Sequence, residues 1–127
     1  MKIWYKAVLE KLRASGLFEE VNLIGAKVRA SIDNTRFLDI HFDPTTRSYS
    51  YALIDLELPY LGDKRFFGWD DYPHEGVVDI VALKTYPHHF QRRAEDGSWI
   101  YQESPMRGDI EDDMDAIIAA LKGYLGG

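Results

Sequence analysis

Hydrophobic residues recur every three or four positions near both ends of the chain and every second position through much of the stretch between them. Residues 2–15 place Trp4, Val8 and Leu12 on one stripe and charged side chains elsewhere, a pattern that predicts an amphipathic helix. Gly16 follows this stretch, at the position where a left-handed residue commonly ends a helix.

The C-terminal stretch shows the same helical spacing more clearly, beginning near Asp109. Acidic residues fill its first turn, where they complement the helix dipole, and Asp109 itself suits the N-cap position. The apolar stripe that follows consists of Ile110, Met114, Ile117, Ile118, Leu121 and Leu125. We therefore predict a second amphipathic helix here.

Short alternating runs separated by turn-forming residues lie between the two predicted helices, which is typical of neighbouring antiparallel strands. The runs cover residues 18–33, 38–43, 49–56, 64–69 and 99–101, and Gly25 marks a bulge or turn inside the first. Residues 77–85 fit either a strand or a short helix. Together the patterns predict one α+β domain over residues 1–127, with an antiparallel β-meander of four or five strands flanked by an N-terminal and a C-terminal amphipathic helix.

Composition narrows the classes of protein further. The absence of cysteine excludes disulfides, zinc–thiolate sites and cysteine nucleophiles. No apolar stretch approaches the ~20 residues that cross a bilayer, and the N-terminus lacks a signal-peptide pattern, so we expect a cytoplasmic protein without membrane contact. The net charge of −6 lies mostly in the acidic start of the last helix, and the chain lacks the strongly basic character of a dedicated nucleic-acid binder.

Asp39, His41 and Asp43 alternate with apolar residues, so they share one face of a strand. Carboxylates beside a histidine favour its charged form, which suits proton transfer or metal binding. A simply solvated strand face gives the same pattern, and it remains the alternative.

Two further segments carry histidine. His88 and His89 follow Pro87, and in extended backbone they point to opposite sides, so at most one faces a given pocket unless the chain bends. Asp70 and His74 lie at the end of a predicted strand, where functional groups are often placed. The alternatives are ordinary loop histidines and an aspartate that begins a turn.

Aromatic and basic residues on the middle strands allow a base-stacking surface with phosphate contacts. The residues concerned are Tyr49, Tyr51, Phe67, Trp69, Arg47, Lys64 and Arg65. Cross-strand packing explains most of the aromatic residues, and we favour it. The chain has no tight metal-ligand spacing, phosphate loop or dinucleotide fingerprint, so we expect no metal and no cofactor.

Three segments together resemble the TumE-type toxin family of bacterial and archaeal toxin–antitoxin pairs. They are Tyr49-Ser50-Tyr51, Phe67-Gly68-Trp69-Asp70-Asp71 with Pro73-His74, and Tyr86-Pro87-His88-His89, followed by Ser104-Pro105 before the last helix. The resemblance covers roughly residues 36–125. Asp71 stands where the family usually has Asn, His74 stands alone where a pair is common, Phe90-Gln91 replaces Lys-His, and residues 77–84 look like an insertion.

The resemblance implies a growth-inhibiting toxin that a cognate antitoxin protein restrains. Our hypothesis for its reaction is RNA cleavage by histidine acid/base catalysis. The catalytic candidates are His88, His89, His74, His41 and Asp70, and the RNA-binding candidates are Arg65, Arg47, Tyr51 and Trp69. Two alternatives remain, a non-catalytic binding or regulatory module and a metal-dependent nuclease built on Asp39, His41 and Asp70. We expect replacement of His88 and His89 by alanine to abolish toxicity without unfolding the protein.

Overall fold

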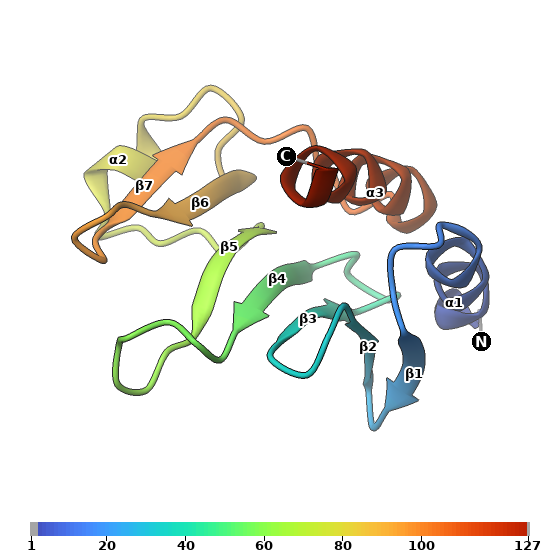
Figure 1. Cartoon of the computed structure of the whole chain (residues 1–127). Helices are drawn as coiled ribbons and strands as arrows, with labels where there is room; N and C mark the ends of the chain where they lie inside the picture. Colours follow the sequence, from blue (N-terminus) through green and yellow to red (C-terminus); the bar gives the residue numbers. More distant parts are fainter. Residues whose placement is uncertain (1–2, 127) are drawn as a thin grey trace.

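A computed structural model describes residues 3–126 of the chain and shows one antiparallel sheet with helices at both ends of the sequence (Figure 1). Seven strands follow one another across the sheet in chain order. They are β1 (Glu20–Ile24), β2 (Lys27–Ser31), β3 (Arg36–Phe42), β4 (Tyr49–Asp55), β5 (Arg65–Asp70), β6 (His89–Arg93) and β7 (Trp99–Gln102). The prediction of an α+β fold with an antiparallel meander and two terminal helices is confirmed.

The helices begin and end close to the predicted positions. Helix α1 spans Trp4–Ala14 and α3 spans Ile110–Gly126; residue 2, where we predicted the first helix to begin, lies outside the described residues. Gly16 has a φ of +74°, so it provides the left-handed residue after α1 that the sequence indicated. The undecided segment 77–85 contains a single helical turn, α2 (Val78–Val81), which buries Ile80.

The sheet has more strands than the four or five we predicted. Gly25, with a φ of +61°, forms a tight turn that divides the first alternating run into β1 and β2. Strand β6 has the sequence His-Phe-Gln-Arg-Arg, in which Phe90 is the one apolar residue, so the hydrophobic pattern did not reveal it.

The hydrophobic core lies between one face of the sheet and the helices α1 and α3. Fully buried side chains come from both layers: Val8, Leu12, Val28, Leu38, Ile40, Tyr51, Leu53, Met114, Ile117 and Leu121. Lys11 and Asp115 join the two helices through an ion pair of 2.9 Å on their outer side. Within residues 3–126, no helix combines the length and the apolarity needed to cross a membrane.

Alternation along the strands gives the sheet two different faces. Tyr51 and Trp69 point toward the helices and belong to the core, so their neighbours Ser50 and Asp70 point away from it. We call the face that α1 and α3 do not cover the open face.

Candidate functional site

A row of polar side chains crosses the open face from β3 to β6. The strand register pairs His41 with Ser50, Ser50 with Asp70, and Asp70 with His89. Paired residues in a sheet share a face, so these four side chains, from four strands and distant in sequence, lie side by side.

His74 completes a compact cluster at one end of this row. The carboxylate oxygen Oδ1 of Asp70 lies 3.2 Å from Nε2 of His89 and 3.8 Å from Nε2 of His74. The centres of the two imidazole rings are 5.1 Å apart. The backbone N–H of Tyr72 donates to the same Asp70 oxygen at 2.9 Å, which fixes the carboxylate and turns the chain so that His74 returns over it. We refer to Asp70, His74 and His89 as the triad.

The hydrogen bond of His89 to its own loop determines what the triad can do. Nδ1 of His89 lies 3.0 Å from the carbonyl oxygen of Pro87, and because a carbonyl only accepts, Nδ1 carries the proton. In the neutral ring Nε2 is then an acceptor that faces a carboxylate. The side chain of His89 is fully buried, and no hydrogen bond within residues 3–126 satisfies Nε2. A proton or another cation is needed between these two atoms.

His74 is the exposed member of the triad, with a side chain 33% accessible to solvent. Partial burial lowers its pKa, and the nearby His89 and Arg65 lower it further, although Asp70 acts in the opposite direction. The neutral form, with a free nitrogen lone pair, is therefore favoured at neutral pH.

A cleft of about 660 Å³ opens over the triad and the polar row. Aromatic side chains (Tyr72, Trp99, Tyr101), imidazoles (His41, His74) and carboxylates (Asp43, Asp70, Asp71) all line it. Arg65 is the one Lys or Arg among the described lining residues, and it already donates to Asp63 at 2.7 Å. We call this space the open-face cleft; its lining is negatively charged overall.

The strand-face group Asp39, His41 and Asp43 does not act as one unit. Asp39 is buried between Arg29 at 2.8 Å and Lys27 at 3.0 Å. Burial by itself opposes ionisation, but the hydrogen bonds from Arg29 and Lys27 outweigh it and lower the pKa of Asp39 below its usual range. Asp39 is thus a structural ion-pair partner, while His41 lies exposed at the cleft.

His88 and His89 point to opposite sides, as the alternation of extended backbone led us to expect. Nδ1 of His88 lies 2.8 Å from the hydroxyl oxygen of Tyr49, and the two rings stack. Burial lowers the pKa of His88, and the positive charge of Arg107 adds to the effect. His88 is therefore separated from the triad, which contains only His89 of this pair.

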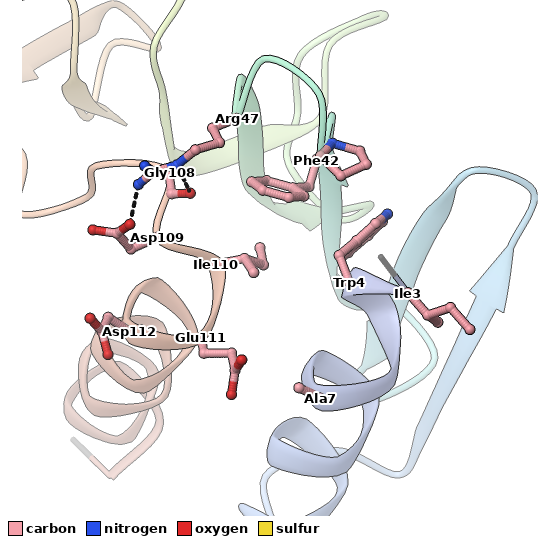
Figure 2. A pocket seen from close by; sticks show the side chains of 11 residues that line it. Ile3, Trp4, Ala7, Phe42, Arg47, Gly108, Asp109, Ile110, Glu111 and Asp112 are labelled. Atoms are coloured by element: carbon pink, nitrogen blue, oxygen red, sulfur yellow. Dashed lines mark hydrogen bonds and ion pairs between the residues drawn. The ribbon is translucent and has the colours of Figure 1, made fainter. Parts of the chain in front are cut away.

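Three of the predicted RNA-binding residues lie away from the open-face cleft. Tyr51 is fully buried and Trp69 is 5% exposed, so neither ring is available to a base, in agreement with the packing interpretation. Arg47 lies at the edge of a different cavity, between the first turns of α1 and α3, where it bonds to Asp109 and to the carbonyl of Gly108 (Figure 2). Only Arg65 remains beside the cleft.

Sequence reasoning missed the aromatic residues that the cleft does expose. Tyr72 is 66% exposed, and Trp99 and Tyr101 of β7 are half-buried along the cleft. The alternation of Trp99 and Tyr101 is visible in the sequence and indicates a strand. The sequence did not show where this strand lies in the sheet, because β6, which pairs with both β5 and β7, has no alternating hydrophobic pattern.

Comparisons of the chain with protein-family models, with curated proteins and with solved structures gave no match. The geometry of the open-face cleft, and the sequence segments that meet there, are therefore what indicate a function.

Proposed function

We propose that this domain is the toxin of a toxin–antitoxin pair, acting in the cytoplasm by cleaving RNA in the open-face cleft under the control of a cognate antitoxin protein. One observation carries the proposal. The three segments that resemble the TumE family, separated along the chain, each contribute to one site: Ser50 from the first, Asp70 and His74 from the second, and His89 from the third.

Cleavage of RNA through its 2′-hydroxyl needs a group that activates this hydroxyl, a group that protonates the leaving oxygen, and positive charge near the phosphate. In the proposed arrangement the triad activates the hydroxyl at the floor of the cleft. Arg65 contacts the phosphate, and the exposed His41 supplies the proton. Each such group typically contributes about 10²–10⁴-fold to the rate.

The half-buried aromatic residues of β7 give the RNA a place to stack. Trp99 and Tyr101 line the cleft beside Arg65, whose guanidinium lies 5.4 Å from the centre of the Trp99 ring. Stacking on an aromatic side chain contributes about 1–3 kcal/mol per base and tolerates any base. The acidic residues Glu111 and Asp112 of α3 line the other cavity, on the helical side of the sheet, and so do not face RNA bound in the cleft.

The structure changes the design of the mutational test. His89 is fully buried and His88 holds Tyr49, so replacing both with alanine removes core contacts together with the reactive groups. Asp70→Asn keeps the shape of the side chain, and His74→Ala changes a partly exposed loop residue. These two variants separate the loss of activity from the loss of fold.

We predict that Asp70→Asn and His74→Ala each lower cleavage of a single-stranded RNA by purified protein at least about 100-fold. Both variants should also lose growth inhibition on expression, while their circular dichroism and unfolding midpoints stay close to those of the wild type. Asp112→Asn makes the same chemical change on exposed α3 and should retain full activity. If the wild type binds RNA without cleaving it, the domain is the non-catalytic binding module and the proposed reaction is wrong.

A further inference from the structure

We infer that Asp70, His74 and His89 together bind one divalent transition-metal ion at the floor of the open-face cleft. The inference goes beyond the proposed function, since the ion would bind whether or not RNA is the substrate. It also differs from the metal-dependent alternative considered from the sequence, because Asp39 is taken up by Arg29 and Lys27.

The spacing of the donor atoms already approaches that of a coordination sphere. Atoms bound to one ion at about 2.0–2.2 Å stand about 3–3.5 Å from one another. In the triad, Asp70 Oδ1 lies 3.2 Å from one imidazole nitrogen and 3.8 Å from the other, and all three donor atoms lie within 4.8 Å of each other. His74 sits in a loop and is partly exposed, so its side chain has room to move toward the other two donors.

The buried histidine provides the second, independent observation. His89 donates its Nδ1 proton to the carbonyl of Pro87, the arrangement that holds a metal-bound imidazole in position and leaves Nε2 unprotonated. That Nε2 is fully buried, has no hydrogen-bond partner within the described residues, and points at the Asp70 carboxylate. An ion bound there gives both atoms a partner and removes the contact between two acceptors.

The donor set indicates which ions fit. Two imidazoles and one carboxylate suit Zn²⁺, Mn²⁺, Fe²⁺, Co²⁺ or Ni²⁺, whereas Mg²⁺ and Ca²⁺ prefer sites made of oxygen atoms. Three protein ligands leave coordination positions open toward the cleft, as in catalytic rather than structural zinc sites.

The charge of the cleft supports the same conclusion. Its lining carries three carboxylates, while its single arginine is already paired with Asp63. Beyond Arg65, the described lining of the cleft holds no Lys or Arg to offset the charge of a phosphate group. A divalent ion offsets the carboxylates at the place where an anionic substrate would approach.

A proton shared between His89 and Asp70 is the competing explanation for their contact. It leaves His74 without a function in the cluster and predicts no affinity for metal ions. Direct binding measurements distinguish the two explanations: calorimetric titration of the metal-free protein with Zn²⁺, and visible absorption with Co²⁺ as a spectroscopic probe.

We expect the wild type to bind one ion per chain, with a Co²⁺ absorption band and a Zn²⁺-dependent increase in the unfolding midpoint. Asp70→Asn and His74→Ala should each weaken ion binding at least about 100-fold and abolish the Zn²⁺-dependent increase in the unfolding midpoint. Each changes a residue that binds the ion directly, and even residues that only hydrogen-bond to a metal ligand typically change the affinity 10–100-fold. His41→Ala, a histidine of the same cleft outside the triad, should bind the ion as the wild type does.

The inference is overturned if the wild type binds no Zn²⁺ or Co²⁺, or if Asp70→Asn and His74→Ala bind as tightly as the wild type. Ion binding without RNA cleavage would uphold the metal site and refute the proposed reaction. RNA cleavage by protein that binds no ion would uphold the proposed reaction and refute the metal site.

Discussion

At the scale of single residues, the partners of three buried or half-buried aspartates decide their roles. Asp39 lies between two cationic side chains, and Asp113 accepts hydrogen bonds from one hydroxyl and two backbone N–H groups. Both carboxylates are fully satisfied and stabilise the fold. Asp70 instead meets two imidazole nitrogens, one of them lacking a hydrogen-bond partner in the part of the chain that the structure describes. Only this third arrangement leaves an open interaction, so we place the chemistry there.

The ion pairs of Asp39 make the stability of the protein depend on pH. The pKa of Asp39 in the folded protein is below its ordinary value of 3.8. Its stabilising contribution is therefore fully present above that ordinary value and is lost as the pH falls through the folded pKa. We predict that Asp39→Asn lowers the free energy of unfolding by about 1–3 kcal/mol at pH 7.

Urea unfolding of the wild type and Asp39→Asn across the acidic range checks this prediction. The difference between them should shrink steadily below pH 4, because the wild-type carboxylate becomes protonated there. Asp112→Asn, at an exposed position, should have the same free energy of unfolding as the wild type at both pH 3 and pH 7. A gap of the same size at pH 3 and pH 7 would mean that the charge of Asp39 is not what stabilises the sheet.

At the scale of elements, β5 and α3 show how the two faces of the sheet are built. Strand β5 sends Trp69 to the core and Asp70 to the open face, so one strand serves both packing and the site. Helix α3 is fixed at its start by Asp113, which holds the preceding loop and the hydroxyl of Tyr51. Tyr51, although it belongs to the Tyr49-Ser50-Tyr51 segment, thus forms a structural contact between the sheet and α3.

We predict that Asp113→Ala destabilises the protein by about 2–4 kcal/mol, because it leaves the Tyr51 hydroxyl and the N–H groups of Arg107 and Gly108 without an acceptor in the interior. Chemical denaturation measures the loss. Asp112→Ala, one position earlier and exposed, serves as the control and should change stability by less than about 0.5 kcal/mol. An equal effect of the two substitutions would show that Asp113 does not anchor the helix.

At the scale of the whole molecule, the sequence predicts the layers better than the site. The two helices and the alternating strands depend on local hydrophobic periodicity, and the opposite directions of His88 and His89 follow from extended backbone, so all of these could be read from the chain. Asp70, His74 and His89 were candidates from the sequence, but their grouping could not be read from it. The grouping depends on the register between β5 and β6 and on a loop that returns His74 to Asp70. Strand β6 buries Gln91 and His89 in place of apolar residues, which hides it from hydrophobic patterning.

The two sides of the sheet also differ in the side chains that they offer to a ligand. Helices α1 and α3 cover one side of the sheet (Figure 1), and the acidic start of α3 lies on that side. The side chains of Tyr72, Trp99, Tyr101, His41 and His74 line the cleft on the other side. We thus expect substrate to bind on the open face and not on the helical side, where Trp4 and Arg47 lie.

Imidazole NMR signals of the four histidines test this placement most directly. The protein is titrated with a 2′-O-methylated RNA oligonucleotide, which lacks the attacking hydroxyl and stays intact. We predict that the signals of His41 and His74 shift with the same apparent affinity, while His88, bonded to Tyr49 on the other side of the sheet, stays unchanged. Shifts confined to His88 and to the indole of Trp4, with His41 and His74 unmoved, would contradict the account.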